Sequence, residues 1–461
     1  MLAAVSLATF LVSLSSNTLS VAVPSVVRHF DASALTAAFI VLTPSCVSTS
    51  LMLTMGRLGD LAGRRAVYLT GIGVFTTASL LAGMAPAPWL LVCLQVCQAA
   101  GTATIWANSA AILLELLPAD RVNHGLGIYI ASISVAELIG PSVGGTISEV
   151  AGWRWIFLLN VPVGIVCWLL GRSVLQPDVR PSRRPSLDIR GNVLILTGLG
   201  GLIVSLSLAQ DSGWAAPVVL FGAGGGVVLL CLFVTRELRA RDPLLDLGIL
   251  RNRSLSLAMA SALANAMAQW SPVLLMVLYF QAVAGDSPIL AGVKVTPLAI
   301  VSATAATSAG RLTKRVRPDT LAVAGSVIAF LGLAFLAIAL RHGYPWILVS
   351  LMLIGAGGGI FGPSNANIVM LRAPQVSAGV INGTRLMLGN VGWVLSTAVV
   401  LTLVTAPLAA GLRREFFAGT ASRVSHAAAL ALLTGYGHAI ILLAAFALTG
   451  ALTALASRTL G

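Results

Sequence analysis

The sequence predicts an all-α integral membrane protein that crosses the bilayer with fourteen helices. Of its 461 residues, 57% are hydrophobic and only 9% are charged, whereas a soluble domain carries about 25% charged residues. Long apolar runs recur along the whole chain, and fourteen helices of about 20 residues each fit within its length. So few charged side chains cannot cover a water-soluble protein, and the composition therefore excludes a cytosolic enzyme.

The predicted helices are apolar runs bounded by charged residues or by proline and glycine. They cover residues 3–27, 34–55, 66–84, 88–112, 124–148, 155–172, 192–210, 216–235, 254–281, 289–310, 320–340, 346–366, 377–405 and 431–456. Two charged segments, 177–191 and 236–253, lie on either side of the seventh and eighth helices. We therefore expect an N-terminal six-helix bundle at 1–176, a linker with two additional transmembrane helices at 177–253, and a C-terminal six-helix bundle at 254–461.

The positions of the basic residues predict the orientation of the chain. With both termini in the cytoplasm, 20 of the 28 Lys and Arg residues lie on the cytoplasmic side, seven lie outside, and Arg385 lies within a helix. This bias is typical of multi-pass proteins of the cell membrane. The net charge of +13 is then explained by attraction to anionic headgroups of the inner leaflet, and no nucleic-acid partner is expected.

A charged loop motif connects the second and third predicted helices. The segment GRLGDLAGRR, residues 56–65, contains glycines that permit a tight turn and a carboxylate close to two arginines. It closely resembles the loop motif G-x-L-a-D-r-x-G-r-r of the major facilitator superfamily. The resemblance implies a cytoplasmic latch formed by Gly56, Asp60, Gly63, Arg64 and Arg65. Taken alone, such a segment is also compatible with a solvated basic loop.

A second motif, GPSVGG, lies at residues 140–145 in the fifth predicted helix. It resembles the antiporter motif g-x-x-x-G-P-x-x-G-G, with Ala136 at the position of the first glycine. Small residues let helices approach closely, and proline kinks a membrane span. The resemblance implies a hinge formed by Gly140, Pro141, Gly144 and Gly145. Small-residue packing without a hinge function is the alternative.

The whole chain resembles the fourteen-helix drug:proton antiporter family of this superfamily. The resemblance includes the arrangement of six, two and six helices and the segments SLSSNTLSVAVP (13–24) and QAVAGDSPILAGVKVTP (281–297). It implies the major facilitator fold, in which two six-helix bundles surround a central cavity, with the additional helix pair and alternating access. The chain departs from the family pattern at Ser15, where relatives often have aspartate, and at Lys314, where the second-half loop motif lacks its acid.

Two charged residues are expected inside membrane spans. Glu137 is the only acidic residue expected near the middle of a helix, and a buried carboxylate must become protonated, find a partner or face water. Because Glu137 shares a helix face with Gly140 and Gly144, we predict that it couples transport to protons. A neutral acid hydrogen-bonded at a helix contact is the alternative. Arg385 is predicted to pair with Glu137, to contact substrate, or to extend to the inner surface.

Polar residues at helical spacing predict the walls of the central cavity. Side chains of this kind are not retained on a lipid-facing surface, although hydrogen bonds between helices are an alternative explanation for some of them. The candidates are Ser16, Asn17, Gln95, Gln98, Thr102, Trp106, Asn265, Gln269, Asn382, Arg385 and Trp393. No metal or cofactor is expected, because the five cysteines and five histidines form no ligand cluster.

These observations and the resemblance predict a secondary active exporter of small lipophilic or amphipathic compounds, driven by proton antiport. The expected partners are a small-molecule substrate, protons and the lipid bilayer, and the protein is expected to be a monomer. The alternative is a lipid or metabolite transporter, or a facilitator without proton coupling, which the missing acid at Ser15 favours. An enzyme is not expected, because no nucleophile with a base and no ligand cluster is visible.

Overall fold

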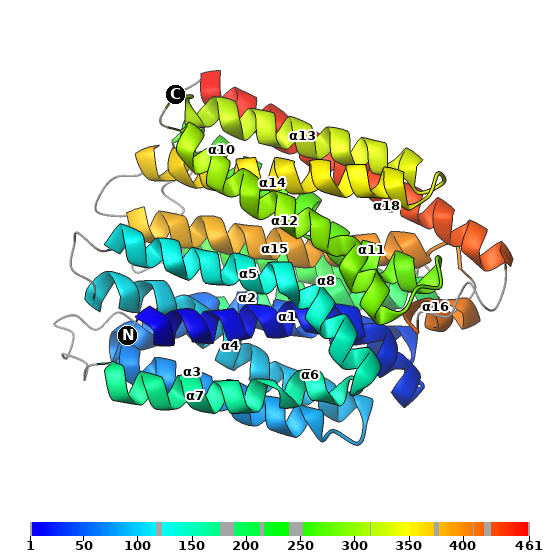
Figure 1. Ribbon diagram of the computed structural model, residues 1–461, viewed down its shortest axis with the longest axis horizontal. Coiled ribbons are helices and arrows are strands. Elements are labelled where there is room, and N and C mark those ends of the chain that lie inside the picture. Colours follow the sequence, from blue (N-terminus) through cyan, green and yellow to red (C-terminus); the bar gives the residue numbers. More distant parts are fainter. Residues whose placement is uncertain are drawn as a thin grey trace.

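The computed structural model describes residues 2–116, 122–175, 189–212, 216–238, 252–313, 315–372, 378–408, 410–418 and 426–459, with the side chains of some helical residues excepted. All regular structure in these ranges is α-helical, and the long helices lie side by side in one bundle with both termini at the same end (Figure 1). We call this end the terminal end and the opposite end the distal end. The two charged linkers lie largely outside the described residues.

The helices follow the predicted spans closely. In the N-terminal part they are α1 (Leu2–Phe30), α2 (Ala34–Ala62), α3 (Arg64–Gly83), α4 (Pro88–Leu116), α5 (Val122–Val150), α6 (Arg154–Leu158) and α7 (Asn160–Val174). The middle pair is α8 (Ile189–Ser212) and α9 (Pro217–Glu237). The C-terminal part has α10 (Arg253–Gln269), α11 (Ser271–Ala282), α12 (Pro288–Leu312), α13 (Pro318–Ala339), α14 (Tyr344–Arg372), α15 (Ala378–Thr405), α16 (Ala410–Phe417) and α18 (His426–Thr459).

Among the described residues, 12 helical segments are long and apolar enough to cross a membrane. Two of these segments join consecutive helices, namely 154–174 (α6 with α7) and 253–282 (α10 with α11). The helices α5 and α8, with 29 and 24 residues, are not among the 12. The architecture is thus all-helical with about twelve candidate spans, and the count of fourteen stays a prediction.

Two predicted spans contain a break that hydropathy does not reveal. The sixth span is interrupted at Leu159 and the ninth at Trp270, so that each consists of two helices. Proline explains both breaks, because Pro162 and Pro272 lie just after them and have no N–H group to continue the helical hydrogen bonding. A short helix, α16, also lies between the predicted spans 377–405 and 431–456.

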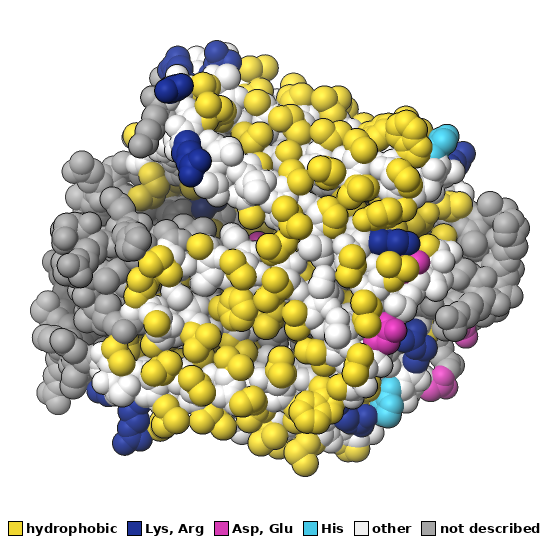
Figure 2. Space-filling view, viewed as in Figure 1, with side chains coloured by type: hydrophobic (Ala, Val, Ile, Leu, Met, Phe, Trp, Pro, Cys, Tyr) yellow, Lys and Arg dark blue, Asp and Glu magenta, His cyan; other side chains and the backbone are white. Residues whose placement is uncertain are grey.

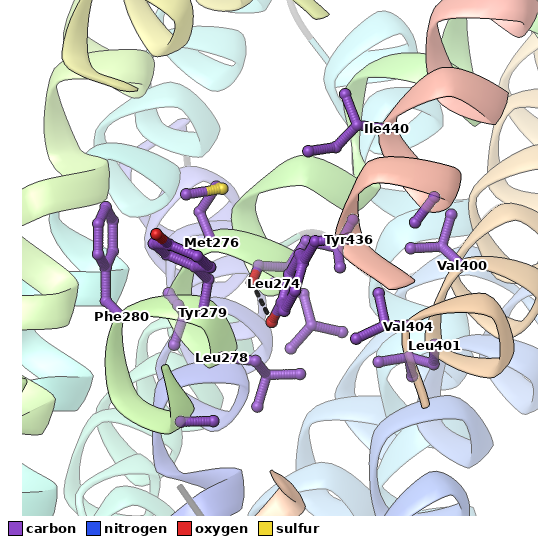
Figure 3. Packing of buried hydrophobic residues seen from close by; sticks show 14 of the residues in the cluster. Leu274, Met276, Leu278, Tyr279, Phe280, Val400, Leu401, Val404, Tyr436 and Ile440 are labelled. Carbon is purple, nitrogen blue, oxygen red and sulfur yellow. Dashed lines mark hydrogen bonds between the residues drawn. The ribbon is translucent and has the colours of Figure 1, made fainter. Parts of the chain in front are cut away.

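The largest apolar core joins the two halves near the distal end. It includes Val21 and Val27 of α1 together with side chains of α11, α15 and α18. Figure 3 shows Tyr279 and Tyr436 packed with Leu274, Leu278 and Val404 in this cluster. The buried Tyr436 hydroxyl donates to the carbonyl of Leu275 at 3.1 Å, which satisfies the phenol inside an apolar core.

The surface of the bundle is suited to lipid. Large side chains such as Phe221 on α9 and Leu331 on α13 are 81% and 53% exposed, and hydrophobic groups cover much of the middle of the visible face (Figure 2). Charged groups on that face gather mainly towards its two ends. An apolar belt between two charged ends is the surface expected of a protein embedded in a bilayer.

Candidate functional site

The two halves touch where α5 packs against α12. A Cβ atom added at Gly145 would overlap the carbonyl oxygen of Pro288, and one added at Gly292 would overlap the carbonyl oxygen of Pro141. Near this contact the hydroxyls of Ser142 and Thr296 are 2.8 Å apart. The backbones of the two helices are therefore in direct contact, as small residues allow. The predicted antiporter motif thus lies at a contact between the two halves.

The same motif also packs against α1. A Cβ atom added at Gly140 would be 2.5 Å from Cβ of Asn17, and one at Gly144 would be 2.6 Å from Cα of Thr18. Nearer the distal end, Ser148 donates to the hydroxyl of Ser25 at 2.9 Å. The helix α5 is therefore held between α1 of its own half and α12 of the other half.

Glu137 lies at the edge of this three-helix contact. Gly140, three residues later, meets α1, and Pro141, four residues later, meets α12. Because residues three and four apart share one helix face, Glu137 faces the seam between the halves, one turn towards the terminal end. Its side chain is exposed and makes no hydrogen bond or ion pair with any described residue, Arg385 included. The carboxylate is therefore accessible beside the contact between the halves.

An aromatic pair lies on the C-terminal half. The rings of Trp270, at the break between α10 and α11, and Trp393 of α15 are 5.9 Å apart. Trp270 is 49% exposed, although its span is the most buried of the twelve. Trp270 is therefore the accessible member of this pair, at a break in an otherwise enclosed span. Helical spacing predicted Trp393 as a cavity residue but not Trp270, which the Trp-Ser-Pro sequence at the break could have indicated.

The polar residues of the ninth span form a hydrogen-bonded chain inside the C-terminal half. Asn265 is 1% exposed and donates to the hydroxyl of Ser326 on α13 at 3.0 Å. Gln269 donates to the amide oxygen of Asn265 at 2.8 Å, and Ser261 donates to the carbonyl of Gly450 on α18 at 3.0 Å. The structure therefore places Asn265 and Gln269 where they join α10 to its neighbours.

The predicted residues of the fourth span lie mostly inside the N-terminal half. Gln98 donates to the hydroxyl of Ser79 on α3 at 2.7 Å, and Thr102 donates to the carbonyl of Gln98 at 3.0 Å. Trp106 is half-buried against an apolar cluster of this half. Gln95 is completely buried, and neither of its amide atoms has a partner among the described residues.

The first span presents one accessible polar position. Ser16 is exposed and donates to the carbonyl of Val12 at 3.1 Å, whereas Asn17 is half-buried and donates to the carbonyl of Ser13 at 2.9 Å. Ser15 is buried and accepts a hydrogen bond from the amide of Asn160 on α7 at 2.9 Å. A neutral pair thus occupies the position where relatives often carry an acid.

The loop motif forms contacts within the N-terminal half. Arg64 and Asp60 form an ion pair at 2.9 Å, and Arg65 donates to the carbonyl of Arg172 at the end of α7 at 2.8 Å. Gly63, with φ of +98°, makes the turn between α2 and α3, a backbone conformation that favours glycine. A Cβ atom added at Gly56 would be 3.7 Å from Cβ of Ala107. These contacts tie α2, α3 and α7 together at the terminal end.

The C-terminal half has a charged contact that the sequence analysis missed. Arg372 at the end of α14 forms an ion pair with Asp319 at the start of α13 at 2.5 Å. The same guanidinium donates to the hydroxyl of Ser457 on α18.

Lys314 of the second loop motif lies outside the described residues, as does the side chain of Asn382. Arg385 is half-buried on α15, one turn from Gly389, whose added Cβ would be 3.8 Å from Cβ of Ala266.

Comparison with known proteins identifies the family. The Major Facilitator Superfamily model matches residues 5–397. The chain is 27% identical to the multidrug resistance protein Stp of Mycobacterium tuberculosis (strain ATCC 25618 / H37Rv), over 89% of this chain and 76% of that protein. It is 30% identical to the puromycin resistance protein pur8 of Streptomyces alboniger, over 88% of this chain and 81% of that protein.

Solved structures support the same fold. A bacterial homolog of the human lysosomal transporter Spinster, in an inward-facing and unoccupied conformation, aligns with a TM-score of 0.72 at 16% identity, covering 99% of this chain and 96% of the other. A POT family transporter in complex with 5-aminolevulinic acid aligns with a TM-score of 0.63 at 15% identity, covering 92% and 94%. This chain belongs to the major facilitator superfamily and is a multi-pass membrane transporter rather than an enzyme.

Proposed function

We propose that this protein exports small lipophilic or amphipathic compounds by alternating access, in exchange for protons. The observation that carries the proposal is the position of Glu137, an accessible carboxylate with no partner among the described residues, beside the contact between α5 and α12. The names of the relatives support the direction of transport, because they are resistance proteins for multiple drugs and for puromycin. Export from the cell explains such resistance.

The contacts between the halves support an inward-facing state. Gln281 of α11 donates to the carbonyl of Val21 at 3.1 Å, and Glu149 accepts from the backbone N–H of Ile289 at 3.2 Å. These contacts lie nearer the distal end than Glu137, which is exposed. With the termini in the cytoplasm, as the basic residues predict, the closed end faces outwards and the open seam faces inwards.

Glu137 would act as a protonation switch. A charged carboxylate favours a hydrated seam, because removing it from water without a partner costs several kcal/mol. Once Glu137 is protonated, the helices can close around it at much lower cost. In the outward-facing state the carboxylate would be hydrated from outside. A proton that binds it there would let the helices close around it and return to the inward-facing state after substrate is released, which is the order that antiport requires.

The walls of the seam support a lipophilic cargo. Trp270 and Trp393 offer aromatic surface, and Ser16 and Asn17 offer neutral polar groups. With Glu137 as the single acid predicted within a span, two positive charges on a substrate would be poorly compensated. We therefore infer that the cargo is neutral, zwitterionic or singly charged.

The additional helix pair completes a proposed count of fourteen spans, once α5 and α8 are included. The helix α8 packs against α2 of the N-terminal half and α15 of the C-terminal half. Its Ile195 and Leu199 share an apolar cluster with Leu42 of α2 and Val394 of α15. We propose that each chain works as a monomer, with the helix pair 177–253 bridging the two six-helix bundles.

Transport in proteoliposomes tests this function, with puromycin and ethidium as probes. A lumen more acidic than the medium should accelerate uptake by the wild-type protein, and Glu137→Gln should abolish the acceleration. Glu137→Asp is the matched control, because it keeps a titratable carboxylate at the same position, and it should keep the acceleration. A Glu137→Gln protein that responds like the wild type would refute coupling at this residue. Wild-type uptake that does not depend on the pH gradient would support a facilitator instead.

A further inference from the structure

A small hollow lies on the outer flank of the C-terminal half, between α13 and α18. It has a volume of about 250 Å³, and its lining includes Leu340, Arg341, Thr434, Gly437, His438 and Ile441. The hollow is at the distal end, where α13 ends at Ala339 and α18 begins. It lies away from the contact between α5 and α12, so the transport cycle proposed above does not use it.

The hollow lies at the depth of lipid headgroups. On α18, 20 residues separate His438 from Arg458, which corresponds to about 30 Å of helix, the thickness of the hydrocarbon core. The helix α13 has 22 residues, or about 33 Å, and Arg341 lies two residues beyond its end. The candidate span of α18, Ala431–Thr459, has 29 residues and is longer than the hydrocarbon core. His438, seven residues into it, therefore lies near the distal boundary, beside Arg341.

The chemistry of the hollow is that of a phosphate site with an apolar flank. Arg341 and His438 are both exposed, and the side chain of neither has a hydrogen-bond or ion-pair partner among the described residues. No acid is among the described residues that line the hollow. Ile441, 61% exposed, continues the wall towards the middle of the membrane. A Cβ atom added at Gly437 would meet nothing within 4 Å, so the missing side chain leaves the space open.

We propose that this hollow binds the headgroup of an anionic phospholipid. The guanidinium of Arg341 would hold the phosphate in the bidentate manner that arginine favours, and His438 would add a donor from the other helix. An acyl chain would lie along Ile441. The apolar flank favours a lipid over a soluble anion, because a free phosphate ion gains nothing from an exposed isoleucine beside it. The bound lipid would hold α13 and α18 together.

Thermal unfolding of the purified protein in detergent tests the proposal, with dioleoylphosphatidylglycerol added at rising mole fraction. The anionic lipid should raise the midpoint temperature saturably, and zwitterionic dioleoylphosphatidylcholine should not. Arg341→Gln should raise the half-saturating mole fraction about fivefold, and Gly437→Leu should abolish saturation by filling the hollow. Matched controls are Arg458→Gln, at the other end of α18, and Gly224→Leu, at a glycine of α9 with equally open space; both should behave like the wild type.

Three outcomes would overturn the assignment. One is an equal response of wild-type protein, Arg341→Gln and Gly437→Leu to the anionic lipid. Another is an equal loss of the saturable rise in midpoint temperature in the two control variants, which would indicate a general effect of surface charge or bulk. The third is a saturable, Arg341-dependent shift produced by inorganic phosphate without lipid, which would assign the hollow to a soluble anion. If Gly437→Leu does not fold, Arg341→Gln and its charge-retaining partner Arg341→Lys still decide, because the lysine variant should keep most of the response.

Discussion

Gly145 of α5 and Gly292 of α12 each lie against the backbone of the opposite helix, at the contact that joins the two halves of the transporter. The two glycines are related by the antiparallel course of their helices, since Gly145 meets Pro288 and Gly292 meets Pro141. A side chain at either position has no room while the contact exists. The closed distal end therefore depends on the absence of two side chains.

A valine at either glycine should open the distal end. Overpacking of this kind costs about 2 kcal/mol, which corresponds to about a thirtyfold shift away from the closed contact. Spin labels at the neighbouring exposed positions 150 and 290, in a background without cysteines, would report the change as a longer distance. Gly73→Val is the control, because an added Cβ there meets open space. Unchanged distances in both Gly145→Val and Gly292→Val would contradict the expectation.

Replacement of Trp270 by alanine should weaken transport of aromatic cargo. Removal of an aromatic side chain that stacks on a nucleic-acid base costs about 1 to 3 kcal/mol of binding free energy. A similar loss here should raise the substrate concentration for half-maximal uptake about tenfold. Trp89→Ala is the matched control. Trp89 lies at the start of α4, is similarly exposed at 51%, and packs against Phe39 of α2. Concentration-dependent puromycin uptake by both variants provides the test, and equal effects would contradict a binding role.

Ser15→Ala should lower stability without changing the response to a pH gradient. The substitution leaves the amide of Asn160 without its acceptor inside the bundle, a loss of about 1 to 3 kcal/mol. The midpoint of thermal unfolding in detergent should fall by several degrees, while the acceleration by an acidic lumen stays as in the wild type. A lost acceleration in Ser15→Ala would place proton coupling on α1 rather than at Glu137.

Asp319→Ala and Arg372→Ala should each destabilise the C-terminal half strongly. The two side chains are largely buried, at 14% and 16% exposure, and removal of one partner of a buried pair costs about 3 to 5 kcal/mol. The double variant should lose less than the sum of the single losses. A double-mutant cycle by thermal unfolding measures this coupling, and additive losses would show that the pair contributes nothing beyond its separate groups.

Hydropathy was sufficient to locate the twelve candidate spans, because these segments carry the apolar composition that a bilayer requires. It could not show the breaks at Leu159 and Trp270, since the apolar composition continues across both. The resemblance to known motifs located the loop and the glycine-rich segment of α5, and the structure shows what each one touches.

The walls of the site were harder to predict from the sequence. Helical spacing assigns Asn265 and Ser16 to polar faces, but it does not say which neighbour each face meets. In the structure Asn265 is enclosed between helices of one half, whereas Ser16 remains accessible. The pair of Arg372 and Asp319 was missed because its members are 53 residues apart, and no local pattern links them.

The position of α8 has a consequence for how cargo reaches the protein. This helix covers the joint between α2 and α15, so one flank of the molecule is shielded from the surrounding acyl chains. A compound dissolved in the membrane interior therefore has no direct sideways entry along that flank. Under the proposed export function, its approach would come from the aqueous side or from a flank of the bundle that α8 does not cover.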